Sequence, residues 1–121
     1  MTLETIELKD PSLLKTQTFI NGQWCDGDSG EHFEVINPAN GEMITQVVSV
    51  GEIETRRAIE AAQVALPFWQ AQSAKQRSHI LRGWYDLIMA NQEDLARIMT
   101  YEQGKPLAES RSEIAYGASF I

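Results

Sequence analysis

The sequence predicts an α/β protein in which two β-hairpins are followed by about four α-helices. Before residue 50, short β-branched and aromatic runs alternate with turn residues, and after it the apolar residues recur with the 3.6-residue period of a helix. No low-complexity linker or internal repeat separates the two regions. A chain of 121 residues with 43% hydrophobic content has room for one modest core at most, so we expect one continuous module.

The first hairpin follows a polar arm. Residues 1–15 are weakly patterned and predict an arm with at most a short helix at Ser12–Lys15. Thr18–Ile20 and Gln23–Cys25 then flank Asn21-Gly22. Because this pair tolerates a positive φ at both central positions, it predicts a type I′ turn between two strands.

The second hairpin is expected from the β-branched and aromatic residues on either side of a turn. Phe33–Val35 alternates apolar and acidic residues, and Met43–Val50 is rich in β-branched residues. Pro38 and Gly41 mark the turn between them. Two hairpins of this size cannot bury both faces alone, so they require helices or a larger sheet as a packing partner.

Two helices are predicted next, each with its own N-terminal signal. Ser49 with Glu52 fits a capping box for the first helix, which Pro67 is expected to kink or end. Ser73 with Gln76 repeats this pattern for a second helix that runs to about Asn91. The apolar stripe of the first helix contains Ile59, Ala62, Leu66 and Trp69. The apolar stripe of the second helix contains Ile80, Leu81, Trp84, Leu87 and Ile88, and we expect this second stripe to be buried.

The last two helices are separated by a glycine and a proline. Asn91 is expected to cap the third helix, Gly104 to end it in the left-handed conformation, and Pro106 to open the fourth. The fourth helix has no stop signal before Ile121, so we expect the sequence to be part of a longer one. The acidic side chains of these helices are predicted to form a solvated face: Glu52, Glu54, Glu60, Glu93, Asp94, Glu109 and Glu113.

The charge and the termini exclude several classes of partner. Seventeen acidic and 10 basic residues give a net charge of −7, which disfavours binding to nucleic acid or anionic lipid. There is no basic and apolar leader and no run of about 20 apolar residues, so we expect a cytoplasmic protein that does not span a membrane. The single cysteine, Cys25, follows Trp24 at a strand and predicts a small buried side chain rather than a nucleophile. His32 and His79 show no metal-ligand spacing.

Glu102 is the acidic residue with an unusual position. It falls in the last turn of the third helix, where a carboxylate meets the negative end of the helix dipole. Compensation is expected from Lys105 or from a bound cation. An exposed glutamate that tolerates a small electrostatic cost is an equally acceptable interpretation.

Several segments, in this order, resemble the start of an aldehyde dehydrogenase. They are FINGQW, EVINPANGEMITQVVSV, the helical run that contains EQGKPLAES, and EIAYGASFI, and together they extend the resemblance over residues 16–121. Among aldehyde dehydrogenases, EQGKPLAES followed by EIAYGASF is most similar to the succinate-semialdehyde dehydrogenases, which commonly use NADP, and next to their glutarate-semialdehyde relatives. The resemblance implies that 1–15 is an arm and that 16–121 is the incomplete N-terminal part of the cofactor-binding domain.

The resemblance also implies which chemistry lies outside this segment. In the family a cysteine thiolate attacks the aldehyde, hydride passes to NAD(P)⁺, and a glutamate activates water. Neither Cys25 nor Glu102 corresponds to these residues, so the chain alone is expected to have no catalytic residue, to bind no cofactor and to be inactive. The complete enzyme would be a cytoplasmic homo-oligomer, a dimer or tetramer, that acts on a small aldehyde.

Two further roles are implied for particular residues of this chain. In some family members a monovalent cation is held by main-chain carbonyls and an acidic side chain, which here would be Val35, Ile36 and Glu102. The helix after Pro106 lines the substrate tunnel in relatives, which makes Tyr116 and Phe120 candidate tunnel residues.

Two other hypotheses stay open from the sequence. The chain is interpreted either as a stand-alone acidic helical module whose Trp69 and Trp84 faces bind a partner protein, or as a structural or regulatory remnant that docks on an intact dehydrogenase subunit. A reading frame that continues into a cysteine and a glutamate in family context would favour the enzyme.

Overall fold

The computed structural model describes residues 5–121 and contains two hairpins followed by four helices, which confirms the predicted α/β order. A short 3₁₀ helix, η1, precedes them and occupies Pro11–Leu13, slightly earlier than expected. The strands are β1 (Thr18–Ile20), β2 (Gln23–Cys25), β3 (His32–Ile36) and β4 (Met43–Val48). The helices are α1 (Glu52–Ala71), α2 (Ala74–Ala90), α3 (Gln92–Gln103) and α4 (Leu107–Ala118).

Each pair of strands forms its own antiparallel two-stranded sheet. In the β1–β2 hairpin, Asn21 and Gly22 have φ values of 51° and 76°, as a type I′ turn requires. In the β3–β4 hairpin, Val35 pairs with Thr45 and Ile36 with Met43, so Ile44 is the extra residue of a bulge. The side chain of Ile44 is buried, and the bulge therefore turns one large apolar residue of β4 inward.

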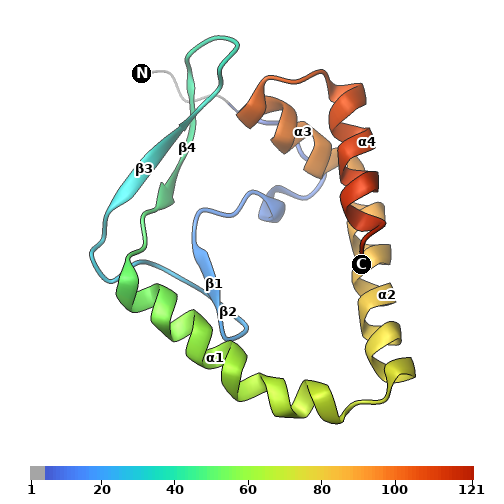
Figure 1. Ribbon diagram of the computed structural model, residues 1–121. Helices are drawn as coiled ribbons and strands as arrows, with labels where there is room; N and C mark the ends of the chain where they lie inside the picture. Colours follow the sequence, from blue (N-terminus) through green and yellow to red (C-terminus); the bar gives the residue numbers. More distant parts are fainter. Residues whose placement is uncertain (1–4) are drawn as a thin grey trace.

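The elements form an open frame, as Figure 1 shows. The β3–β4 hairpin makes one side, α2 with α4 beside it makes the opposite side, and α3 packs on α4. Helix α1 runs between the two sides along the bottom of the view, and η1 and the β1–β2 hairpin lie inside the frame. The long helix α1 thus separates the β3–β4 hairpin from α2.

The predicted buried stripe of the second helix is wrong for this chain. Ile80, Trp84 and Leu87 are 52%, 56% and 65% exposed, because no element within residues 5–121 covers that face of α2. The buried apolar side chains of the described residues are Ile44, Val48, Ala96 and Ala118. An amphipathic pattern reports that a face needs burial but does not say what covers it.

The start of the first helix differs from the prediction, and of the two outcomes expected at Pro67, a kink or an end, the structure excludes the end. Helix α1 starts after Gly51 rather than after Ser49, because the Ser49 amide donates to the Glu31 carbonyl at 2.8 Å and so extends the β3–β4 ladder. Pro67 does not end the helix, which continues to Ala71.

The other helix signals match the structure more closely. At α2 the predicted capping box is present, with the Ser73 amide donating to Gln76 Oε1 at 2.8 Å and the Gln76 amide donating to Ser73 Oγ at 3.3 Å. Asn91 precedes α3 as expected, but its side chain donates to the Leu87 carbonyl instead of capping α3. Among residues 5–121, none of the helices combines the length and hydrophobicity needed to cross a bilayer.

Candidate functional site

Helix α3 ends against the turn that follows β3. Gly104 terminates the helix in the left-handed region with φ of 78°, and its amide donates to the Thr100 carbonyl at 2.8 Å. A Cβ atom at Gly104 would lie 2.9 Å from Cγ of Pro38. The predicted left-handed stop is therefore confirmed, and the close approach to Pro38 gives this glycine a second reason to lack a side chain.

The turn that receives α3 is organised by Asn37, which is itself buried. The Asn37 amide donates to the Glu42 carbonyl at 2.9 Å, and the Gly41 amide donates to the Asn37 carbonyl at 2.8 Å. Asn37 Oδ1 accepts from the Ala39 amide at 2.9 Å. These bonds fix the turn directly after Val35 and Ile36, the two residues whose carbonyls were predicted as cation ligands.

Glu102 lies in the last turn of α3, two residues before Gly104, and is exposed. Partial desolvation raises the pKa of its carboxyl group. Lys105, one of the two predicted compensating groups, is instead bonded to the carboxylate of Glu113 on α4. The end of α3 thus has an acidic side chain whose expected lysine partner is engaged elsewhere.

A pocket of about 460 Å³ lies between α3 and α4 next to Glu102. It is lined by Leu95, Ile98, Met99, Glu102, Gln103, Glu113 and Ile114. The residues of the described range contain no group of three or more acidic, histidine or cysteine side chains placed to hold a metal ion. Val35 and Ile36 do not line this pocket, and the set Val35, Ile36 and Glu102 as cation ligands stays a prediction.

Tyr116 of α4 and Phe120 in the turn directly after it form an aromatic pair. Their ring centroids are 4.8 Å apart with an interplanar angle of 84°, an edge-to-face arrangement. They are 66% and 72% exposed. The two rings therefore meet one turn apart as their spacing predicts, on a face that nothing in residues 5–121 covers. Their role as tunnel residues stays a prediction.

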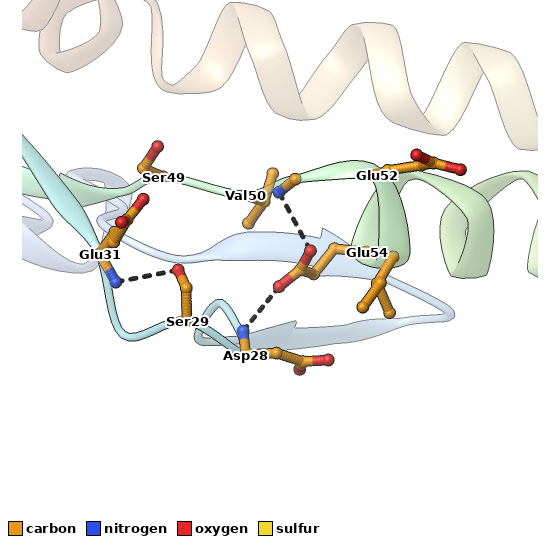
Figure 2. A pocket seen from close by; sticks show the side chains of 9 residues that line it. Asp28, Ser29, Glu31, Ser49, Val50, Glu52 and Glu54 are labelled. Carbon is orange, nitrogen blue, oxygen red and sulfur yellow. Dashed lines mark hydrogen bonds between the residues drawn. The ribbon is translucent and has the colours of Figure 1, made fainter.

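The solvated acidic face was wrong at two positions. Glu54 is only 4% exposed, and it accepts from the Asp28 amide at 2.6 Å and from the Gly51 amide at 3.0 Å, as Figure 2 shows. These backbone hydrogen bonds, that from Asp28 foremost, lower the pKa of Glu54. The carboxylate thus joins the 27–30 turn to the start of α1 and forms one wall of a pocket of about 250 Å³.

Asp94 is the second buried carboxylate and is also 4% exposed. It accepts from the Lys9 amide at 3.1 Å and from the Asp10 amide at 2.9 Å. Arg97 adds a bond from its guanidinium to the Glu7 carbonyl at 3.1 Å. The polar arm of the sequence is therefore held on the first turns of α3, a contact that only tertiary structure reveals.

Glu93, next to Asp94, connects α3 with α4. Its carboxylate accepts from Nε and Nη2 of Arg111 at 2.7 and 3.0 Å, and from Nε of Arg97 at 3.3 Å. The hydrogen bond with Arg111 is the largest contribution that lowers the pKa of Glu93 to about 2. Of these two adjacent acidic residues, Asp94 therefore binds the N-terminal arm and Glu93 binds α4.

Cys25 and His32 make ordinary structural contacts. Cys25 is half-buried in β2, and its Sγ donates to the Thr18 carbonyl at 3.6 Å. His32 is exposed, with Nδ1 2.9 Å from the Gly30 carbonyl. Nothing in these contacts activates either side chain for covalent chemistry.

The frame of two hairpins and four helices is the arrangement found at the N-terminus of aldehyde dehydrogenase structures. The chain belongs to the aldehyde dehydrogenase family, whose family model matches residues 24–121. This match confirms the resemblance seen in the sequence.

Individual relatives agree with this assignment. The glutarate-semialdehyde dehydrogenase of Pseudomonas putida is 58% identical over 116 residues, which cover 96% of this chain and 24% of that protein. The NADP(+) succinate-semialdehyde dehydrogenase of Escherichia coli is 53% identical over the same shares. A crystal structure described as an E. coli NADP-dependent enzyme superimposes with a TM-score of 0.92 at 54% identity, and covers 94% of this chain and 24% of that one. The chain thus spans about a quarter of the length of these relatives.

Proposed function

We propose that the chain is the N-terminal part of an NAD(P)-dependent dehydrogenase that oxidises a carboxylate-bearing aldehyde, with succinate semialdehyde oxidised to succinate as the preferred reaction. The observation that most supports a semialdehyde as the class of substrate is the identity of 58% and 53% to glutarate- and succinate-semialdehyde dehydrogenases over 96% of the chain. The name of the second relative includes NADP(+), which supports NADP⁺ as the cofactor here, with NAD⁺ as the alternative.

The role of residues 16–121 in that enzyme is structural in this proposal. The bound nicotinamide nucleotide supplies the hydride acceptor, and residues outside this chain supply the nucleophile and the base. Cys25 and Glu54 are engaged in backbone contacts that hold a hairpin and a helix start in place. We expect the segment to pack as part of the cofactor-binding domain of a cytoplasmic homo-oligomer, and we expect the 121-residue chain alone to bind no cofactor.

The test of substrate and cofactor choice is a kinetic comparison in the full-length enzyme that carries this segment. We expect kcat/KM to be highest for succinate semialdehyde with NADP⁺, with glutarate semialdehyde second. A neutral aldehyde of equal length serves as the matched control, because it lacks the distal carboxylate. Equal kcat/KM for the neutral aldehyde and both semialdehydes would contradict the proposed substrate class.

We further propose that Val35, Ile36 and Glu102 hold a monovalent cation. The junction of Gly104 with Pro38 brings the end of α3 to the turn after these carbonyls, and Lys105 is committed to Glu113. Hard oxygen ligands suit Na⁺ or K⁺, and a cation would offset the charge of Glu102 at the negative end of the dipole.

The cation is tested by the melting temperature of the full-length enzyme in NaCl, KCl and a bulky organic cation chloride at matched ionic strength. We expect Tm to be higher in Na⁺ or K⁺ for the wild type, and the difference to disappear in Glu102→Gln. Glu52→Gln, on the exposed face of α1, is the control. Equal Tm in all three salts would contradict the cation site.

Tyr116 and Phe120 are proposed as walls of the substrate tunnel, which their exposed edge-to-face pair at the end of α4 supports. The alternative to an enzyme segment is a stand-alone module that binds a partner protein through its aromatic faces. The 56% exposure of Trp84 is the observation that favours it, and the measurements in the Discussion separate the two.

A further inference from the structure

Helix α4 presents two opposite faces. Successive residues of a helix are rotated by about 100°, so Ser110, Arg111 and Ala118 share one side of α4, while Tyr116 lies on the other. Phe120 lies in the turn directly after α4, and its ring packs against that of Tyr116. Ser110 and Ala118 are buried, and the two aromatic side chains are exposed. Because a helix is rigid over this length, whatever fixes the first face also fixes the direction of Tyr116, against which Phe120 packs.

The docked face of α4 contains both small and large side chains. Ser110 and Ala118 are buried on it, and Leu107 and Ile114, which share this side of the helix, are half-buried. Because apolar burial is non-directional, directional bonds add the constraint that sets the rotation of α4 about its axis.

Those bonds are concentrated on two adjacent residues of α4. The hydroxyl groups of Ser110 and Thr100 are 2.8 Å apart. Arg111 reaches Glu93 through two parallel N–H donors at 2.7 and 3.0 Å, and the Arg111 carbonyl accepts from Nε2 of Gln92 at 2.9 Å. A bidentate arginine–carboxylate pair fixes orientation as well as distance, unlike an ordinary surface ion pair.

Glu93 is also held by an arginine of its own helix, Arg97. Nε of Arg97 donates to its carboxylate, and Nη1 of the same arginine donates to the Glu7 carbonyl of the arm. The Glu93 carboxylate therefore binds two guanidinium groups, and that of Arg97 is also bonded to the arm. Since these bonds fix the position of the carboxylate on α3, its bond to Arg111 fixes the position of α4.

We propose that Glu93 and Arg111 are positioning residues that set the rotation of α4 on α3, and through it the placement of the Tyr116–Phe120 pair against the aldehyde. The proposal rests on the tunnel role suggested above for the two aromatic residues. It assigns to Glu93 an effect on substrate binding although its carboxylate is on the face of α4 opposite to Tyr116.

The experiment uses the full-length enzyme that carries this segment, with Glu93→Gln as the main variant. Glu93→Gln keeps the shape of the side chain and removes its charge. We expect its KM for succinate semialdehyde to be roughly three- to tenfold higher than that of the wild type, and its kcat to stay within about twofold. The reason is that contacts with the tunnel wall stabilise the ground state and the transition state alike. Glu93→Asp, which retains a carboxylate, is expected to restore most of the KM. Glu52→Gln, which breaks an exposed ion pair with Arg56 on α1, is expected to change neither constant.

A second readout reports α4 directly. Hydrogen exchange of the α4 amides is expected to be roughly fivefold faster in Glu93→Gln and unchanged in Glu52→Gln, because loosened docking raises local opening. If Glu93→Gln does not fold, Arg111→Lys keeps the charge, loses the bidentate geometry and is expected to give the same two changes.

The outcomes separate this inference from the tunnel assignment. Unchanged KM and unchanged α4 exchange in Glu93→Gln, with KM raised in Tyr116→Ala and Phe120→Ala, would overturn the positioning role alone. Faster α4 exchange with no effect of the two aromatic truncations on KM would support the setting of α4 by Glu93 and overturn the tunnel role. If the enzyme oxidises no aldehyde, the exchange of α4 decides whether Glu93 and Arg111 set this helix.

Discussion

Three carboxylates connect parts of this chain that are far apart in the sequence. Glu54 binds the 27–30 turn, Asp94 binds the arm, and Glu93 binds α4. All three lie in the first turn of a helix, where the helix dipole favours a negative charge. Each residue therefore helps its own helix to begin and ties a second segment to that point.

The ion pair of Glu93 predicts a specific acid dependence. Its folded pKa is about 2, below the usual 4.5, because of the hydrogen bonds from Arg111 and then Arg97. Since the unfolded state binds the proton more readily, the stabilisation is present above about pH 4.5 and is lost as the pH falls towards 2. We therefore expect the Tm difference between wild type and Glu93→Gln to shrink as the pH is lowered from about 6 to about 3. A difference that stays constant over this range would contradict the ion pair.

Sequence reasoning placed these acidic residues on helices but could not predict which are buried. The position of Glu54 three residues after Gly51 is a recognisable N-terminal signal, whereas its second donor is the amide of Asp28, 26 residues earlier. Asp94 binds amides 84 and 85 residues away. Contacts at this separation depend on the tertiary fold, and a local pattern contains no information about them.

At the scale of the elements, local signals were reliable where the local chain alone decides the geometry. The Asn21-Gly22 turn, the Ser73–Gln76 capping box and the Gly104 stop all involve residues within a few positions of one another. The start of α1 was misplaced because Ser49 is used by the β3–β4 ladder. A capping signal fails where a neighbouring strand takes the same backbone group.

Gly104 allows the junction between α3 and the Asn37 turn to be tested. An alanine there would need the left-handed conformation and would place its Cβ 2.9 Å from Cγ of Pro38. Gly22 has a similar φ of 76° with open space around it, so Gly22→Ala is the matched control. We expect about 1 kcal/mol of destabilisation from the backbone at either site and about 1–3 kcal/mol more at Gly104 from the contact.

The measurement for the glycine pair is the free energy of unfolding of the full-length enzyme by denaturant. Equal losses for Gly104→Ala and Gly22→Ala would mean that the junction with Pro38 does not constrain the end of α3.

At the scale of the whole molecule, residues 5–121 form a frame rather than a closed core. Large apolar side chains are exposed on α1, α2 and α4, among them Phe68, Trp84 and Tyr116. The periodic pattern of the sequence identified the apolar faces, and the family resemblance supplied their interpretation as surfaces covered in a larger fold. The frame itself fits an N-terminal quarter of a dehydrogenase subunit, as the TM-score of 0.92 indicates.

Trp84 distinguishes a packing face from a partner-binding module. In the full-length enzyme, Trp84→Ala is expected to cost roughly 3–5 kcal/mol, the range for a large aromatic side chain removed from a core. Thr55→Ala, at an exposed position of α1, is the control. A loss below about 1 kcal/mol, typical of a surface substitution, would leave the Trp84 face uncovered and favour the module.

The central claim is that this chain supplies scaffold and that the aldehyde chemistry depends on residues outside it. The most direct measurement is a side-by-side assay of the purified 121-residue chain and of the full-length enzyme, each with succinate semialdehyde and with NAD⁺ or NADP⁺ at high protein concentration. We predict turnover by the full-length enzyme and none by the 121-residue chain with either cofactor. Turnover by the chain that Cys25→Ala abolishes, or no turnover by the full-length enzyme, would contradict the account.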